Sequence, residues 1–193
     1  MSILDYFKAE AAGVSFDRPL VEQTRLQIYS DGACTANGRR AAQAAFAAVV
    51  FKNGREVHSV AECLGPKELH TNQRAELKGL LKAMEIASVS EEGADIHTDS
   101  QYALDCLQEW APRWVAKGWR KADGEPVLNQ DILKPMWALW KNRGSKIRLF
   151  HIRSHTGRTD AHSRGNERAD QLATGCLQLA TGKLREEKED EYW

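Results

Sequence analysis

The sequence predicts an α/β fold in which a mixed five-stranded sheet is flanked by helices. Two features support this class. Three strand-like segments follow one another closely near the start, as in an antiparallel meander, and helical and strand-like segments alternate from residue 71 onwards. Ligands of such sheets bind beyond the carboxyl ends of the parallel strands, so functional side chains are expected at that edge.

The antiparallel strands are expected at residues 25–30, 45–52 and 56–64. The first segment, RLQIYS, ends at Asp31-Gly32, a pair typical of a turn. The second and third segments, AFAAVVFK and EVHSVAECL, are separated by Asn53-Gly54, which accepts the positive φ angles of a two-residue hairpin. Such short connections favour antiparallel pairing of successive strands.

Helical spacing of apolar residues predicts three helices, the first of them long, and a further helix is expected to begin at Ser100. The three apolar stripes consist of Leu77, Leu80, Leu81, Met84 and Ala87, then Leu133, Met136, Trp137 and Trp140, and finally Ala169, Leu172, Ala173 and Cys176. The last two strands are expected at residues 95–98 and 146–152, where KIRLFHI alternates apolar and polar residues.

One domain, residues 23–182, is expected between an N-terminal extension (1–22) and an acidic, solvated tail (183–193). The chain of 193 residues contains 27 Lys and Arg and 27 Asp and Glu, so its formal net charge is zero. A uniformly basic or acidic chain is therefore excluded, and the local distribution of charge becomes informative.

The sequence contains no apolar run long enough to span a bilayer. Residues 1–20 have neither the apolar centre of a signal peptide nor the acid-poor character of a transit peptide. Cys34, Cys63, Cys106 and Cys176 do not have the spacing of a zinc site or a disulfide framework. An intracellular, reducing location, in the cytoplasm or the nucleus, is expected.

Four acidic residues are expected to meet at one edge of the sheet. Asp31 and Asp99 each follow a predicted strand, and Glu76 and Asp170 lie beside the apolar stripes of two helices. Each has a structural alternative. Asp31 could begin a turn and Asp99 could cap a helix. Glu76 and Asp170 could simply favour the N-terminal ends of their helices.

Carboxylates that cluster repel one another unless a cation neutralises them. Oxygen ligands without Cys or His favour Mg²⁺ or Mn²⁺, which accept a substrate phosphate as a further ligand. Two such ions can activate a water molecule and stabilise the leaving oxygen of a phosphodiester. The four acids together therefore predict a metal centre suited to phosphodiester chemistry.

Four motifs carry a resemblance to a known family: YSDGAC (29–34), TNQRAEL (71–77), HTDSQY (97–102) and SHTGRTDAHSRGNERADQLA (154–173). They occur in the order found in type 1 ribonuclease H, which the sequence resembles over residues 23–182. The resemblance implies a ribonuclease H-like fold. It also implies an endonuclease that hydrolyses the RNA strand of RNA·DNA hybrids and leaves 3′-hydroxyl and 5′-phosphate ends.

The resemblance also implies roles for individual residues. Two Mg²⁺ ions, for which Mn²⁺ can substitute, are bound by Asp31, Glu76, Asp99 and Asp170. His155 matches a loop histidine that assists proton transfer or product release, a role that suits an imidazole titrating near neutrality. His162 is a less favoured alternative to His155. Asn166 matches a polar residue near the metal ions.

Recognition of the hybrid is expected in its minor groove, where 2′-hydroxyls mark the RNA strand. The resemblance places Asn72 and Gln73 against bases or sugars, and backbone groups near Cys34 and Asn37 against 2′-hydroxyls. Thr71 matches a residue that holds a DNA-strand phosphate. Thr71 and Asn72 have helix capping as an alternative role, which is compatible with binding.

A basic segment interleaved with tryptophan follows Asp99. Residues 110–153 carry ten basic and three acidic side chains, a net charge of +7, which favours contact with a phosphate backbone. The run from Trp114 to Arg120 resembles the basic protrusion, or handle, of cellular ribonucleases H. We expect some indoles to pack in the core, whereas Trp119 and its neighbouring cations contact the DNA strand. The candidate contact residues are Trp114, Lys117, Trp119, Arg120 and Lys121.

The expected partner is an RNA·DNA hybrid, and the chain is expected to act as a monomer without membrane contact. Ile3, Tyr6 and Phe7 resemble the core of a sliding-clamp-binding peptide, although a simple apolar contact with the domain is favoured. Two alternative functions stay open, a non-catalytic hybrid-binding module and a retroelement-type ribonuclease H domain. Four clustered acids are energetically unfavourable and argue against a module that only binds. The handle argues against a retroelement-type domain.

Overall fold

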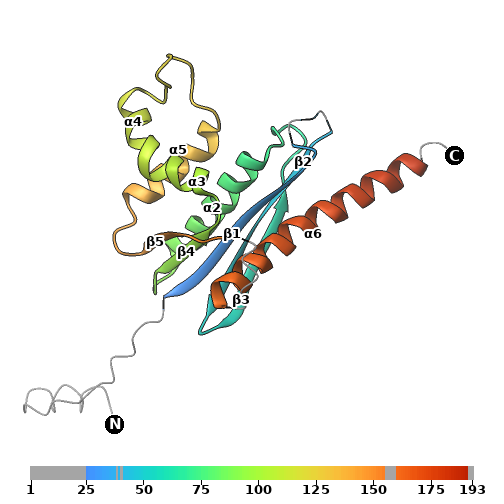
Figure 1. Ribbon diagram of the computed structural model, residues 1–193, viewed down its shortest axis with the longest axis horizontal. Coiled ribbons are helices and arrows are strands. Elements are labelled where there is room, and N and C mark those ends of the chain that lie inside the picture. Colours follow the sequence, from blue (N-terminus) through green and yellow to red (C-terminus); the bar gives the residue numbers. More distant parts are fainter. Residues whose placement is uncertain (1–24, 38, 40, 155–159, 191–193) are drawn as a thin grey trace, which may run out of the picture.

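The computed structural model describes residues 25–37, 39, 41–154 and 160–190, the last eight of these by their backbone alone. Its strands are β1 (Leu26–Thr35), β2 (Gln43–Lys52), β3 (Arg55–Cys63), β4 (Ala94–Thr98) and β5 (Ile147–His151). They form one sheet in the order β3-β2-β1-β4-β5 (Figure 1). β1, β2 and β3 pair antiparallel, whereas β4 pairs parallel with both β1 and β5. The predicted mixed five-stranded sheet is confirmed.

The hairpin between β2 and β3 has the predicted two-residue turn. Asn53 has a φ of 52° and Gly54 a φ of 75°, and Lys52 pairs with Arg55 across the turn. Positive φ at both central residues gives the turn a twist that matches that of the two strands. Local chemistry is therefore sufficient to set this connection.

β1 is longer than the sequence indicated, and Asp31-Gly32 is not a turn. The parallel pairing of β1 with β4 ends at the pair Ser30 and Thr98, but β1 continues antiparallel to β2 as far as Thr35. The backbone groups of residues 31–35 are therefore satisfied by β2, and the chain has no reason to turn at Asp31. The turn begins at residue 36 instead.

Helices cover both faces of the sheet (Figure 1). One face carries α2 (Asn72–Val89), α5 (Gln130–Lys141) and the consecutive segments α3 (Gln101–Asp105), η1 (Cys106–Trp110) and α4 (Ala111–Ala116), and the other carries α6 (Ala161–Asp190). Adjacent residues of β1 show the division, because Ile28 packs with Leu80 in the large core, whereas Tyr29 packs with Ala169 of α6.

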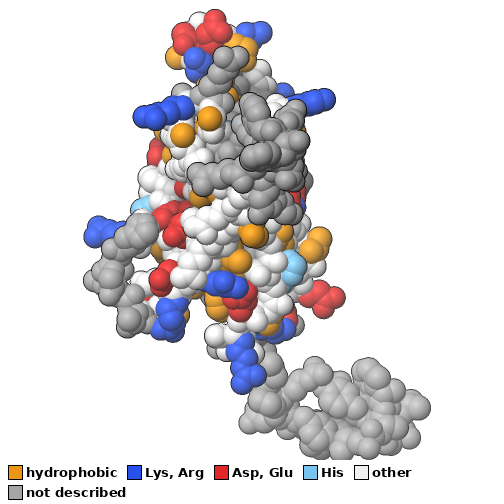
Figure 2. Space-filling model, turned by 90° about the vertical axis from the view of Figure 1, so that its right-hand side faces the viewer, with side chains coloured by type: hydrophobic (Ala, Val, Ile, Leu, Met, Phe, Trp, Pro, Cys, Tyr) orange, Lys and Arg blue, Asp and Glu red, His pale blue; other side chains and the backbone are white. Residues whose placement is uncertain are grey.

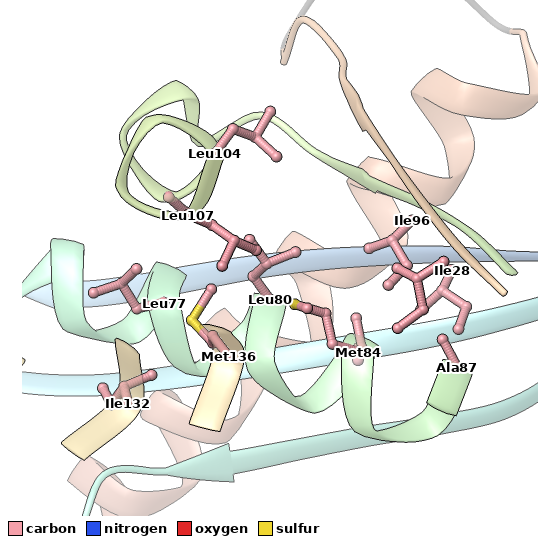
Figure 3. Close-up of a cluster of buried hydrophobic side chains, with 14 of the residues drawn as sticks. Ile28, Leu77, Leu80, Met84, Ala87, Ile96, Leu104, Leu107, Ile132 and Met136 are labelled. Atoms are coloured by element: carbon pink, nitrogen blue, oxygen red, sulfur yellow. The ribbon is translucent and has the colours of Figure 1, made fainter. Parts of the chain in front are cut away.

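The large core lies between α2, α5 and the sheet (Figure 3). Its largest fully buried side chains come from five different elements: Ile28, Leu77, Leu80, Met84, Ile96, Leu107, Ile132, Leu133 and Met136. Burial of one such side chain contributes roughly 1.5–3 kcal/mol to folding. This packing holds the N-terminal half of α2 against β1, where the acidic residues lie.

α6 extends into the region predicted to be a tail, as far as Asp190. It runs without interruption from Ala161 to Asp190, so the expected boundary at residue 182 falls inside the helix. The residues after Gly182 include Leu, Arg, Glu and Lys and no Pro or Gly, and these types favour helix. Residues 183–190 are therefore helical, and their role as a solvated tail stays a prediction.

Among the helices that the structure describes, none is both long and apolar enough to cross a membrane. Figure 2 shows basic and acidic side chains interspersed over one face of the molecule.

Candidate active site

Asp31 and Asp99 emerge side by side because of the register between β1 and β4. Ser30 and Thr98 are the last residues that these two parallel strands pair. Asp31 and Asp99 each come next in the chain, at the same edge of the sheet. The expectation that parallel strands deliver two carboxylates together therefore holds, although β1 itself continues.

Glu76 reaches the same place from α2. Thr71 is the N-cap of this helix and accepts a hydrogen bond from the Arg74 backbone N–H at 3.2 Å. Gly32 allows α2 to approach β1 closely, because a Cβ atom at this position would lie 2.3 Å from the Glu76 backbone nitrogen. Asp31, Glu76 and Asp99 each offer a carboxylate oxygen, and these oxygens lie within 4.8 Å of one another.

The three-carboxylate cluster is electrostatically strained without a cation. Burial, and then the charge of Asp99, raise the pKa of Asp31 to about 7. Burial, and then the charge of Asp31, raise the pKa of Glu76 to about 9. Glu76 Oε2 is buried and has no hydrogen-bond partner among the described residues. Clustered oxygen donors with one unsatisfied buried oxygen fit a hard divalent cation.

Asp170 lies near this cluster but outside it. Its charge contributes to raising the pKa of Asp31, after the larger effects of burial and Asp99. The side chain is half-buried on α6, and its Oδ1 accepts a hydrogen bond from Thr174 Oγ1 at 3.3 Å. All four predicted acids are therefore within electrostatic range, and oxygens of three of them lie within 4.8 Å of one another.

Asn166 connects α6 to the cluster. Its Nδ2 donates a hydrogen bond to Asp99 Oδ2 at 3.2 Å. Asn166 is buried and lies one helical turn before Asp170. The residue that the resemblance assigned to the neighbourhood of the metal ions therefore contacts one of the acids directly.

Several predicted substrate-contacting residues gather at the start of α2. Asn37 Oδ1 accepts a hydrogen bond from the Asn72 backbone N–H at 3.2 Å, and the Cys34 thiol donates to the same oxygen at 3.9 Å. Asn72 and Gln73 are exposed. The loop after β1 and the first turn of α2 thus form one polar surface beside Glu76.

Arg74 is a positioning residue that sequence reasoning missed. Its buried guanidinium donates to Glu68 at 2.8 Å, to Asn129 Oδ1 at 3.1 Å and to Asp131, which lies in the first turn of α5. Arg74 lies two residues before Glu76, so these contacts hold the first turn of α2 against α5. The sequence does contain a signal for a buried cation. Arg74 lies three residues before Leu77 and therefore on the apolar face of the helix.

The tryptophan-rich segment divides into a packed part and an exposed part. Five indoles are partly buried against the large core: Trp110, Trp114, Trp119, Trp137 and Trp140. Lys117, Arg120 and Lys121 are exposed. Arg120 Nη1 donates to the Gly124 carbonyl at 2.8 Å, and Lys121 pairs with Asp123 at 3.2 Å. The expected packing of indoles is confirmed, and contact with DNA stays a prediction.

Two predicted features lie outside the described residues. They are His155 and the peptide containing Ile3, Tyr6 and Phe7. His162, the alternative histidine, is described, and its Nδ1 lies 3.1 Å from the Tyr29 hydroxyl. Its ring also lies against His97, with 4.5 Å between centroids.

The sheet order and the carboxylates at the end of its parallel pair define an α/β protein with an acidic site at one edge of its sheet. A family model described as RNase H matches residues 23–178. The chain therefore belongs to the RNase H family.

Curated relatives support the same family. A protein named Ribonuclease H from Thiobacillus denitrificans is 35% identical over 154 residues, which cover 79% of this chain and 94% of the relative. Another with this name, from Cupriavidus pinatubonensis, is 36% identical over 155 residues, covering 80% and 97%. These relatives and the family match identify the chain as a ribonuclease H enzyme.

Solved structures support the fold. The solution structure of the PFV RNase H domain has a TM-score of 0.68 and 22% identity, and the match covers 80% of this chain and 95% of that domain. At this identity the likeness concerns the fold alone. Together, the family and the fold support cleavage of the RNA strand of RNA/DNA hybrids.

Proposed function

We propose that the chain cleaves the RNA strand of RNA·DNA hybrids endonucleolytically with two Mg²⁺ ions and leaves 3′-hydroxyl and 5′-phosphate ends. The observation that carries this proposal is that carboxylate oxygens of Asp31, Glu76 and Asp99 lie within 4.8 Å of one another on a ribonuclease H fold. Three buried or half-buried acids at one point are difficult to explain by folding alone, because mutual repulsion and burial oppose their ionisation.

The residues present fit divalent ions as ligands. Asp31, Glu76 and Asp99 would hold them, and Asp170, at the border of the cluster, would complete the set. Carboxylates without Cys or His favour hard ions such as Mg²⁺, with Mn²⁺ as a substitute. When bound, the ions would supply activation of the attacking water and stabilisation of the leaving oxygen.

The other residues would orient these ligands and move protons. Asn166 would fix the rotamer of Asp99 through its hydrogen bond to Oδ2. Arg74 would hold the first turn of α2, and therefore Glu76, against α5. By resemblance to the family, His155 would assist proton transfer or product release.

The polar surface at the start of α2 would recognise the RNA strand. Exposed Asn72 and Gln73 supply amide donors and acceptors suited to a minor groove, and Cys34 and Asn37 lie beside them. Thr71 would contact a DNA phosphate while its side chain caps the helix. Lys117, Arg120 and Lys121 would bind the DNA backbone from the handle.

Cleavage of labelled RNA·DNA, RNA·RNA and single-stranded RNA, each with Mg²⁺ and with a chelator, tests this proposal. We expect internal cuts in the RNA strand of the hybrid alone, and only with the ion. Phosphatase should remove a phosphate from the 5′ ends, and a polymerase should extend the 3′ ends. Cleavage of single-stranded RNA at a similar rate, or activity in chelator, would contradict the proposal.

A further inference from the structure

Two cysteines that are not among the predicted site residues both line the interface between β3 and α6. Cys63 is the last residue of β3, which forms one edge of the sheet, and Cys176 lies on α6. Neither cysteine is in a disulfide, both are half-buried, and Cys176 contributes to raising the pKa of Cys63. They are separated by about 110 residues of sequence, so the contact is a product of the fold.

The periodicities of the two elements explain why these thiols meet. Successive side chains of a strand point to opposite faces, and Ala61 and Cys63 both face α6, whereas Glu62 approaches Lys82 of α2. On α6, Cys176 follows Leu172 by one helical turn, on the side that packs against the sheet. Strand alternation and helical spacing therefore each direct one thiol into the same interface.

The pair is accessible to small molecules. Cys63 and Cys176 both line a cavity of about 750 Å³ between β3 and α6, whose other walls include Ala61, Leu172 and Leu179. A small disulfide reagent can enter a space of this size. The remaining cysteines are differently placed, because Cys106 is fully buried in the large core and Cys34 lies beside Asn37.

We propose that Cys63 and Cys176 form a reversible disulfide that links α6 to the edge of the sheet under oxidising conditions. A low-molecular-weight disulfide, such as oxidised glutathione, is the oxidant. One cysteine thiolate attacks it, forms a mixed disulfide and releases one glutathione thiolate. The second cysteine thiolate then attacks the protein sulfur of the mixed disulfide and releases the other. The two protons lost by the cysteines pass to the two glutathione thiolates, so two thiols are oxidised and one disulfide is reduced.

The surroundings of the pair make its oxidation slow at neutral pH. Burial, and then hydrogen bonding with the Cys176 thiol, raise the pKa of Cys63 to about 12. Only the thiolate is nucleophilic, so the reduced pair persists in a reducing compartment. Once formed, the bond would close a loop of about 110 residues, and cross-links over long loops give the larger gains in stability. Asp170 lies on the same helix, so the cross-link would also restrain a residue of the active-site border.

The test is to incubate the full chain with oxidised glutathione at mildly alkaline pH and to map disulfides by mass spectrometry after alkylation. We expect a peptide linking Cys63 to Cys176 and loss of two of the four thiols. The melting temperature should rise by about 5–10 °C and return to its starting value with dithiothreitol.

C63S and C176S should each lose both the linked peptide and the rise in melting temperature, whereas C34S should keep both. Melting of the reduced variants shows whether they fold like the parent chain. The proposal would be overturned if the parent chain gave only glutathione adducts, another pairing or cross-linked dimers. If the linked peptide formed without a rise in melting temperature, the claim that the disulfide stabilises the fold by joining α6 to the sheet would be wrong.

Discussion

Asn166 donates a hydrogen bond to Asp99 Oδ2 at 3.2 Å, while its own Oδ1 is buried without a partner in the part of the chain that the structure describes. The bond joins α6 to the residue that follows β4, across 67 positions of sequence. A carboxylate that accepts such a bond is restricted in rotation. Asn166 therefore couples the placement of α6 to the geometry of the three-carboxylate cluster.

N166A should lower kcat/KM by about 10–100-fold and raise the Mg²⁺ concentration needed for half-maximal rate, since loss of a residue that orients a metal ligand has effects of this size. Hybrid cleavage measured over a range of Mg²⁺ concentrations checks this. Q171A, an exposed position on the same helix, is the control. A variant with normal Mg²⁺ dependence would show that Asn166 does not orient Asp99.

The unequal positions of the acids predict unequal effects of their removal. D31N and D99N should each reduce cleavage by about 10³-fold or more, because each removes a ligand from the close cluster. D170N should cost only about 10–100-fold, because Asp170 lies at the border. Single-turnover rates measure the difference, and filter binding should show that all three variants retain the hybrid. Equal losses in the three variants would place Asp170 inside the cluster.

Because the pKa of Glu76 is raised, we expect the metal-free protein to lose stability as pH rises. Its folded-state pKa of about 9, and that of about 7 for Asp31, lie above the ordinary carboxyl values. Between about pH 4.5 and pH 9 the folded state therefore binds more protons than the unfolded state, and the free energy of unfolding falls with rising pH. Mg²⁺ should reverse this fall, because it favours the ionised carboxylates.

E76Q should therefore be more stable than the parent chain in chelator at mildly alkaline pH, by about 1–3 kcal/mol, and inactive. Urea unfolding at several pH values, with chelator or Mg²⁺, measures both effects. E85Q changes an exposed glutamate of the same helix and serves as the control. If stability in chelator rose with pH over this range, repulsion among the acids would not be a cost to folding.

Much of the fold could be predicted because its signals are local. The hairpin depends on Asn53 and Gly54 alone, and both have the positive φ that their types favour. The buried stripe of α2 appears in the sequence as Leu77, Leu80 and Met84 at helical spacing. Such features need no knowledge of distant partners.

The features that were missed depend on partners far away in sequence. Whether the chain turns at Asp31 is decided by β2, which continues to pair with β1 after the parallel strand β4 has ended. The role of Arg74 requires Asp131 to come from α5, and no local pattern indicates that pair. Four acids at one edge could be inferred from the order of elements, but the exclusion of Asp170 from the closest contacts could not.

The handle should bind phosphates, with unequal contributions from its cations. Simultaneous replacement of Lys117, Arg120 and Lys121 by alanine should raise KM and flatten its salt dependence by about 0.9 in log–log slope for each lost phosphate contact. Lys117 should contribute more than Lys121, because Lys117 has no ion-pair partner among the described residues, whereas Lys121 pairs with Asp123. KM measured over a range of salt tests this. R55A, in the β2–β3 hairpin, should leave the slope unchanged, and an unchanged slope in the triple variant would exclude phosphate contact by the handle.

Gly32 should be intolerant of even a methyl group. A Cβ atom there would lie 2.3 Å from the Glu76 backbone nitrogen and 2.5 Å from the Ala75 carbonyl carbon, and these backbone atoms can move only if α2 moves. G32A should therefore cost about 3 kcal/mol of stability, and displacement of Glu76 should lower kcat by about 10²-fold.

G175A is the matched control, because a Cβ atom at Gly175 in α6 meets no atom within 4 Å. Urea unfolding and single-turnover cleavage of both variants measure the effects. Because alanine favours helix, G175A should be as stable as the parent chain or slightly more stable. A G32A variant with normal stability and rate would show that the close approach of α2 to β1 is not needed to place Glu76.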